Sequence, residues 1–241
     1  MDQSAIERKA LQILAAHNAV VTGDHFVYTA GDHGPDYVNK NAVTPHVRGT
    51  YHLSLLMAEH LRFLEPQIII GAVAVGAVIA DQIAWMYSAQ NPDKPEPLAL
   101  LVDKVPYLAR DEHGQLILNE KGEPIILERL ELKRGYNKLL AGQRVVVGED
   151  IVNTGATVKE VVRLVREAGG IVVAVVAMVN RGETVAADFG DGVEFYPLVT
   201  VKMPRFPANV CPLCAEGRQI NTTLGHGAAF VRAHGQPRNE F

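Results

Sequence analysis

R-V-V-V-G-E-D-I-V-N-T-G-A-T occupies residues 144–157 and begins with an uninterrupted aliphatic run, Arg144–Val147. Such a run is typical of a strand that is buried on both faces of a parallel sheet. Two adjacent acids, Glu149 and Asp150, follow the strand, and a loop of small and polar residues, Asn153–Thr157, comes next. The stretch therefore predicts a buried strand that delivers charged and polar groups to its carboxyl end.

A helix and a second strand follow this loop. Residues 157–168 have a helical hydrophobic period, and Gly169-Gly170 predicts its end. The apolar positions are Val158, Val161, Val162 and Val165. Ile171–Val179 is again a continuous aliphatic run. Strand, loop, helix and strand at these lengths predict a βαβ unit, and hence the α/β class.

The same alternation is present upstream. Gln67–Ile70 and Leu98–Val102 read as buried strands, and Ala77–Ser88 between them has the composition of a helix. A small-residue turn, G-A-V-A-V-G at Gly71–Gly76, follows the first of these strands. We expect a central, mainly parallel sheet flanked by helices.

The N-terminal region predicts smaller elements. Ser4–His17 has helical spacing with Ser4 as its N-cap, and two short strands, Phe26–Thr29 and Tyr37–Val38, flank a Gly/Asp/Pro turn. A helix is expected from Thr44-Pro45 to about Leu64.

The segment Asp103–Tyr136 separates two core strands by more than a usual connection. Within it, alternating apolar residues surround Asn119–Gly122, which predicts a β-hairpin. A long hairpin that projects between core strands is more often functional than structural.

Composition excludes several classes of protein. The 241 residues are 48% hydrophobic with a net charge of −4, which argues against disorder and against nucleic-acid binding through bulk charge. No apolar run reaches the roughly 18 residues of a membrane span, and the N-terminus does not resemble a signal peptide. Cys211 and Cys214 read as reduced thiols, so we expect a cytoplasmic protein. The tail after Pro204 is rich in Pro, Gly and polar residues, and its last fifteen or so residues are expected to be poorly ordered.

The loop at Asn153–Thr157 has the chemistry of a phosphate site. Ligands of open parallel sheets bind at the carboxyl ends of strands, and the N–H groups at a helix start bind phosphate. Thr154 and Thr157 add hydroxyl donors, and Gly155 allows close backbone approach. Acids beside a phosphate need another partner, which vicinal ribose hydroxyls and a shared magnesium ion supply. The alternative is an ordinary strand-to-helix turn with incidental acids.

The strand, acid pair, two aliphatics and T-G-x-T loop resemble the fingerprint of type I phosphoribosyltransferases. The resemblance implies that family's fold and its substrate, 5-phosphoribosyl-1-pyrophosphate. It also implies that Glu149 and Asp150 hold the ribose hydroxyls and, through them or through water, Mg²⁺. The 5′-phosphate would lie on the loop residues Asn153, Thr154, Gly155, Ala156 and Thr157. Gly148 and Asn153 depart from the residues usual at their positions.

Two further segments resemble that family. Gly71–Gly76 is similar to its pyrophosphate loop, which makes Ala74, Val75 and Gly76 candidate substrate-binding residues. The L-K-R-G-Y run at 132–136 resembles the end of the flexible loop of orotate phosphoribosyltransferases. The resemblance implies that basic residues of this loop close over the departing pyrophosphate. The candidate catalytic cations are Lys104, Lys133 and Arg134.

The stretch His25–Val38 is similar to the base-contacting segment of the orotate enzymes, so Tyr37 and Lys40 are candidate substrate-binding residues. C-P-L-C-x-x-G at 211–217 also occurs in one branch of them. The implied reaction converts orotate to orotidine 5′-monophosphate and pyrophosphate, a step of pyrimidine biosynthesis. Two features depart from the orotate pattern: Asp32 and His33 stand where a lysine is common, and the insertion 106–129 is unusual. Transfer to another nucleobase, as in purine salvage, is the alternative.

The resemblance implies one domain over residues 1–220, divided into a hood (residues 1–45), a core (residues 46–203) and a flap (residues 104–136). Residues 221–241 form a C-terminal tail. We expect Mg²⁺ as cofactor, a homodimer, small-molecule substrates, and neither nucleic acid nor a membrane as partner.

Three alternatives remain open. A regulator that senses phosphoribosyl pyrophosphate would share the fold, but such proteins usually add a nucleic-acid-binding part. A Rossmann dinucleotide binder is disfavoured because no G-x-G-x-x-G follows a strand. Cys211 and Cys214 have the spacing of half a zinc site, but the downstream histidines His226 and His234 lack the spacing of a zinc finger, and the alternative is two reduced thiols in a tight Pro turn.

Overall fold

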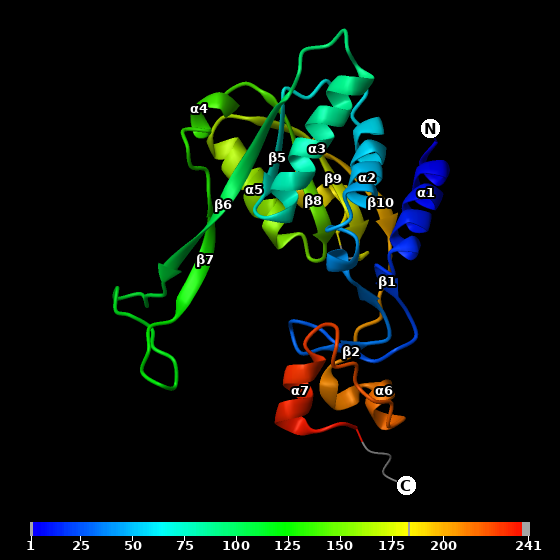
Figure 1. Cartoon of the computed structure of the whole chain (residues 1–241). Coiled ribbons are helices and arrows are strands. Elements are labelled where there is room, and N and C mark those ends of the chain that lie inside the picture. The colour runs from blue at the N-terminus through cyan, green and yellow to red at the C-terminus, as the bar shows by residue number, and fades with distance from the viewer. Residues whose placement is uncertain (1, 183, 238–241) are drawn as a thin grey trace.

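Six strands form the central sheet, in the order β10-β9-β8-β5-β6-β7 (Figure 1). The computed structural model describes residues 2–182 and 184–237. The sheet strands are β5 (Ile68–Ala72), β6 (Leu98–Leu108), β7 (Ile126–Glu131), β8 (Arg144–Val152), β9 (Ile171–Asn180) and β10 (Glu194–Thr200). All neighbours pair in parallel except β6 and β7, which are antiparallel. The predicted α/β class and mainly parallel sheet are confirmed.

Helices cover both faces of this sheet. The helices are α1 (Gln3–Ala16), α2 (Val47–Glu59), α3 (Val75–Gln90), α4 (Asn137–Leu140), α5 (Ala156–Glu167), α6 (Pro212–Ala215) and α7 (Gly227–His234). The 3₁₀ turns in the part of the chain that the structure describes are η1 (Lys40–Ala42), η2 (Ala186–Phe189) and η3 (Ala208–Val210). No helix among the described residues is long and apolar enough to cross a membrane.

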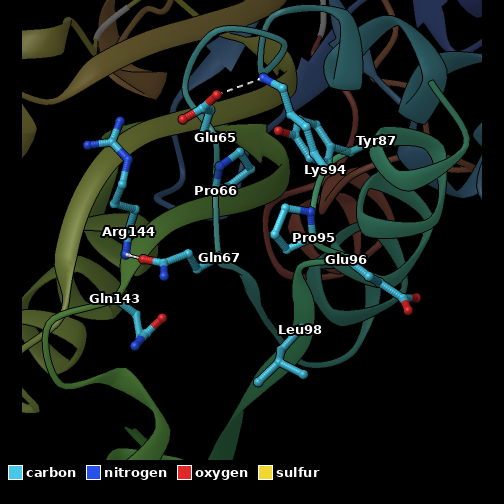
Figure 2. A pocket seen from close by; sticks show the side chains of 10 residues that line it. All are labelled: Glu65, Pro66, Gln67, Tyr87, Lys94, Pro95, Glu96, Leu98, Gln143 and Arg144. Atoms are coloured by element: carbon cyan, nitrogen blue, oxygen red, sulfur yellow. Dashed lines mark hydrogen bonds and ion pairs between the residues drawn. The ribbon is translucent and has the colours of Figure 1, made fainter. Parts of the chain in front are cut away.

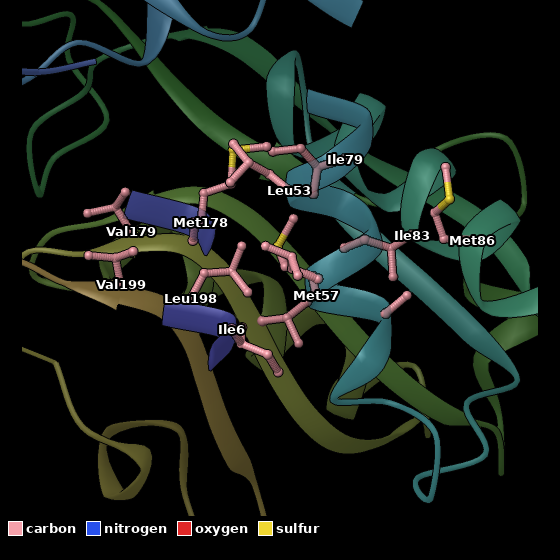
Figure 3. Packing of buried hydrophobic residues seen from close by; sticks show 14 of the residues in the cluster. Ile6, Leu53, Met57, Ile79, Ile83, Met86, Met178, Val179, Leu198 and Val199 are labelled. Atoms are coloured by element: carbon pink, nitrogen blue, oxygen red, sulfur yellow. The ribbon is translucent and has the colours of Figure 1, made fainter. Parts of the chain in front are cut away.

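Alternate residues of the strands point to two separate cores. Ile69 and Val146 face a cluster built with α1, α2 and α3, which contains Leu53 and Ile79 (Figure 3). The adjacent strand residues face the opposite cluster, where the four valines of α5 pack. The strand period of two and the helix period of 3.6 therefore combine into three layers, as the predicted βαβ pattern requires.

Two helix boundaries differ from the expected ones. The N-cap of α1 is Asp2, whose carboxylate accepts a hydrogen bond from the Ala5 N–H at 2.8 Å, and not Ser4. Helix α2 begins at Val47 because Thr44 belongs to the turn that follows η1. It ends at Glu59 rather than near Leu64. The chain continues through tighter turns, in which each N–H bonds to the carbonyl oxygen three residues earlier.

The flap is a long two-stranded arm that projects away from the core (Figure 1). Strand β6 continues past the predicted end at Val102, and its residues 103–108 pair with residues 126–131 of β7. The predicted turn at Asn119–Gly122 is present, with the Gly122 N–H bonded to the Asn119 carbonyl oxygen at 2.9 Å. A second turn near 111–114 lies before it, so the arm ends in two small loops rather than one.

The hood contains two small strand pairs. Strands β1 (Val20–Val21) and β4 (Tyr37–Val38) pair with each other, and β2 (Phe26–Val27) pairs with β3 (His33–Gly34). Figure 1 shows β2 beside α6 and α7, although β2 lies near the start of the sequence and the two helices lie near its end. A backbone bridge between His33 and Phe206 joins them.

Helix α7 lies in the tail segment that was expected to be poorly ordered, so that expectation is wrong for residues 227–234. The segment is anchored by backbone hydrogen bonds to the hood: Asn221 N–H to the His25 carbonyl oxygen at 2.8 Å, and His226 N–H to that of Val27 at 2.9 Å. Residues 238–241 lie outside the described residues.

Candidate active site

The acid pair lies near the carboxyl end of β8. Glu149 is 9% exposed and Asp150 is 3% exposed. A Glu149 carboxylate oxygen accepts a hydrogen bond from the Asp150 N–H at 3.0 Å, and Asp150 accepts one from the Ile151 N–H at 2.6 Å. Burial, and then the neighbouring charge of Asp150, raises the pKa of Glu149 to about 7. The pair therefore carries less than two negative charges at neutral pH.

A lysine of the hood reaches the acid pair. Lys40 Nζ lies 2.8 Å from a carboxylate oxygen of Asp150, and its side chain is 44% exposed. Lys40 begins η1, directly after β4, so the strand that ends the hood delivers this cation. The structure thus brings together three predicted site residues that are about 110 positions apart in the chain.

The loop after β8 has the geometry of an anion site. Gly155 has φ of +75°, which favours glycine, and no side chain caps the start of α5. The N–H groups of the first helical turn therefore remain available to a ligand. A cavity of about 100 Å³ lies here, lined by Glu149 and residues 151–158. Thr184 supports the loop from β9's side by donating its hydroxyl to the Asn153 carbonyl oxygen at 2.8 Å.

The small-residue turn after β5 packs against the acid pair. A Cβ at Gly71 would lie 2.0 Å from the Gly76 carbonyl oxygen, so the turn folds back on itself through glycine. A Cβ at Gly76 would lie 3.4 Å from a Glu149 carboxylate oxygen. Ala74 is exposed, and no side chain caps the start of α3 that follows it. A second open helix N-terminus therefore lies beside the acids.

The flap cations are not in contact with the acid pair. Lys104 and Lys133 are exposed at the base of the arm, and Arg134 forms an ion pair with Asp103. Tyr37 is also directed elsewhere. Its ring packs 5.3 Å from that of Phe26 and beside Gly225.

Arg181 is a candidate site residue that sequence reasoning missed. It follows β9 directly, and its guanidinium carbon lies 4.6 Å from the ring centre of Tyr28 in the hood. Its Nη2 atom is buried and has no hydrogen-bond partner among the residues that the structure describes. Because Asn180 pairs with Val152, Arg181 lies at the same sheet edge as the acid pair. A basic residue immediately after a buried strand was the available signal.

Comparison with known proteins agrees with this geometry. The family model described as "Phosphoribosyl transferase domain" matches residues 112–202. The orotate phosphoribosyltransferase of Carboxydothermus hydrogenoformans is 31% identical over 195 residues, which cover 80% of this chain and 85% of the relative. The chain belongs to the type I phosphoribosyltransferases. It is accordingly a phosphoribosyl-transferring enzyme.

Solved structures share the fold of this phosphoribosyltransferase. The orotate phosphoribosyltransferase of Mycobacterium tuberculosis superposes with a TM-score of 0.54 at 19% identity, covering 80% of this chain and 96% of the other. The adenine phosphoribosyltransferase of Rhodothermus marinus gives 0.53 at 19% identity, covering 80% and 99%. Because the two scores are nearly equal, the fold alone does not select the base.

A larger cavity of about 550 Å³ lies at the opposite edge of the phosphoribosyltransferase sheet (Figure 2). It is lined by residues that precede or begin β5, β6 and β8, among them Gln67, Leu98 and Arg144. These are the amino ends of the strands, whereas ligands of parallel sheets bind at the carboxyl ends. Size alone therefore does not make this cavity the active site.

Proposed function

We propose that the enzyme transfers the phosphoribosyl group of 5-phosphoribosyl-1-pyrophosphate to orotate, giving orotidine 5′-monophosphate and pyrophosphate. The observation that carries the choice of base is Arg181, a half-buried guanidinium with an unpaired Nη2 at the edge that holds the acid pair. Orotate bears a carboxylate, which a guanidinium binds through paired hydrogen bonds. Uncharged bases would leave this buried donor unsatisfied, at a cost of about 1 to 3 kcal/mol.

The sugar phosphate fits the two open helix N-termini. The 5′-phosphate would bind at the start of α5, where Gly155 lets the backbone approach and Thr154 and Thr157 are exposed. The pyrophosphate would bind at Ala74–Gly76, at the N-terminus of α3. Glu149 and Asp150 lie between these two positions and accept hydrogen bonds from the ribose hydroxyls.

The acid pair also fits Mg²⁺, because carboxylate oxygens are ligands that this ion accepts and the glycine at position 76 leaves Glu149 open to it. Bound Mg²⁺ would neutralise charge on the pyrophosphate. Lys40 forms an ion pair with Asp150. We infer that the ammonium of Lys40 turns toward the bound substrate when the ribose hydroxyls replace it at Asp150.

In the reaction, the bond between C1′ and the pyrophosphate oxygen breaks with its electron pair left on that oxygen, and a ring nitrogen of orotate forms the new bond to C1′ as its N–H proton is released. The protein supplies positioning and charge stabilisation. We infer that the flap closes so that Lys104, Lys133 and Arg134 reach the leaving pyrophosphate. Arg134 must then leave Asp103. The family resemblance further predicts a homodimer, which light scattering after size-exclusion chromatography would measure.

The decisive experiment measures pyrophosphate release from phosphoribosyl pyrophosphate and Mg²⁺ with one base at a time: orotate, uracil, hypoxanthine, guanine, adenine or xanthine. We expect release with orotate alone. Release with another base and not with orotate would overturn the substrate and keep the reaction. Binding of the sugar phosphate without release by any base would indicate a regulator.

A further inference from the structure

Four metal-ligand side chains meet where the hood contacts the C-terminal segment. They are His25 and His33 of the hood, and Cys211 and Cys214 at the start of α6. One donor atom of each lies within 4.8 Å of those of the others. Both cysteines are free thiols. This cluster is separate from the acid pair and has no role in the proposed reaction.

Four of the six distances between the donor atoms are close to those of a tetrahedron around one ion, and the other two are within 4.8 Å. The Nε2 atom of His25 lies 3.7 Å from each cysteine sulfur and 3.0 Å from His33 Nδ1, which in turn lies 3.3 Å from Cys214 Sγ. Tetrahedral zinc, with bonds of about 2.0 Å to nitrogen and about 2.3 Å to sulfur, requires neighbouring ligand atoms to be about 3.3 to 3.8 Å apart. The observed spacings nearly match without any rearrangement.

The surroundings orient the ligands. His25 Nδ1 lies 2.7 Å from the Arg218 carbonyl oxygen, which can only accept a hydrogen bond, so the proton is on Nδ1 and the Nε2 lone pair faces the cluster. A backbone carbonyl in this position is the usual support of a metal-binding histidine. His33 is held by two backbone hydrogen bonds to Phe206, each of 2.8 Å. His25, His33 and Cys211 are buried, which excludes water as a competing ligand.

We propose that His25, His33, Cys211 and Cys214 bind one Zn²⁺ in a closed structural site. Two sulfurs and two imidazole nitrogens in a tetrahedron are a ligand set that selects zinc. On binding, each thiol releases its proton to solvent, and the two thiolates balance the charge of the ion. Because the protein fills all four positions, no coordination site remains for catalysis.

The two histidines that complete the cluster lie upstream of the cysteines, and they are not the downstream histidines considered from the sequence. His226 Nε2 lies 3.2 Å from the Thr29 hydroxyl, and His234 Nδ1 lies 3.2 Å from the Phe230 carbonyl oxygen, so both have other partners. In the sequence, the whole core lies between the two upstream histidines, His25 and His33, and Cys211. The ion therefore joins the hood to the C-terminal segment. Strand β2 of the joined hairpin leads directly to Tyr28, on which Arg181 stacks.

The test begins with the wild-type chain, purified, incubated with excess Zn²⁺ and passed through a desalting column. We expect about one zinc per chain by elemental analysis. Replacement by Co²⁺ should give the intense visible bands of a tetrahedral ion and the ultraviolet bands of thiolate ligation. A folded wild-type chain that retains no metal, or a cobalt spectrum without thiolate bands, would overturn the site.

Variants then assign the ligands. Cys214→Ser and His33→Ala should each lower zinc content and zinc affinity at least tenfold, whereas His234→Asn should retain both. Sugar-phosphate binding by each variant reports whether the core is folded, since the ligands lie outside both core clusters. Full zinc retention in a core-folded Cys214→Ser, Cys211→Ser double variant would exclude the proposed ligands. If that variant does not fold, release of one zinc from the wild-type chain on thiol modification decides the question.

Discussion

At the residue scale, the two adjacent acids of β8 have different environments. Asp150 has Lys40 as a counter-charge at 2.8 Å, whereas burial raises the pKa of Glu149 to about 7. One carboxylate therefore has a cationic partner, and the other exchanges a proton near neutral pH. The proposed ligands of this pair, ribose hydroxyls and Mg²⁺, both favour the ionised form.

The first prediction concerns Asp150→Asn. An amide cannot replace the charge that balances Lys40, and it keeps only one of the two oxygens that can accept from ribose, so turnover should fall by about 100-fold or more while the fold is kept. Steady-state rates and circular dichroism measure the two effects. Glu96→Gln, an exposed change at the opposite cavity, is the control. Wild-type activity of the Asp150 variant would remove the acid pair from the site.

The second prediction is a pH dependence caused by Glu149. Its pKa is raised in the folded protein, so the folded state binds more protons than the unfolded state between pH 4.5 and about 7. The free energy of unfolding should therefore fall as pH rises through this window, by about 1 to 3 kcal/mol from this group. Glu149→Gln should lose this contribution. Urea unfolding at pH 5 and pH 8 tests it. If the free energy of unfolding changed equally between these pH values in the wild-type protein and in Glu149→Gln, the prediction would be contradicted.

The third prediction concerns Arg181. Arg181→Gln should raise the KM for orotate at least tenfold and leave the affinity for phosphoribosyl pyrophosphate within a factor of two or so, because only the base carries the carboxylate. Arg144→Gln at the opposite sheet edge is a matched control, since it removes a guanidinium that binds the Leu64 carbonyl oxygen. An unchanged KM for orotate would argue against an anionic base at Arg181.

At the element scale, the strand-to-helix loop depends on one backbone conformation. Gly155 combines φ of +75° with a close neighbour, since an added Cβ would lie 3.2 Å from the Thr184 hydroxyl. Gly155→Ala should cost about 1 to 2 kcal/mol of stability and weaken sugar-phosphate binding. Gly192→Ala has a similar φ of +73° with open space around it, so it should lose stability but retain binding. Equal binding by both variants would show that the loop does not hold the phosphate.

The flap is the second element with a testable role. Lys133→Ala and Arg134→Ala should lower kcat by about 10- to 1,000-fold while substrate binding persists, because their charge is needed when pyrophosphate departs. Arg129→Ala is the control on the same arm, where this arginine pairs with Glu131 and lies over Tyr107. If Arg129→Ala lowered kcat as much, the loss would be caused by misfolding of the arm and not by removal of the charges of Lys133 and Arg134.

How far the sequence predicts these elements depends on how local their signals are. The unit from β8 to β9 follows from local periodicity, and it is confirmed in detail down to the four buried valines of α5. Strand β10 escaped notice because Pro197 interrupts its pattern, which a strand at the sheet edge tolerates. The meeting of His25 with Cys211 and of Arg181 with Tyr28 requires contacts between distant segments, on which periodicity carries no information.

At the scale of the whole molecule, the core clusters are separate from the C-terminal segment that packs beside the region proposed to bind the base. Among residues 2–182 and 184–237, neither of the two core clusters contains a residue beyond Met203, whereas the C-terminal segment packs on the hood. Ending the chain at Arg205 should therefore leave a folded core that binds the sugar phosphate, and it should lower orotate-dependent turnover at least tenfold. Calorimetry and binding assays measure the first result, and rates measure the second. Full turnover by the shortened chain would contradict the role of this segment.

The backbone bridge between His33 and Phe206 also orders events during synthesis. The ribosome makes His33 early, and Phe206 follows 173 positions later. At about 5 to 20 residues per second, the nascent hood hairpin waits about 10 to 35 s for its partner. Every core strand has left the peptidyl transferase centre by then, since β10 ends at Thr200. The region proposed to select the base is thus completed last, after the segments proposed to bind the sugar phosphate.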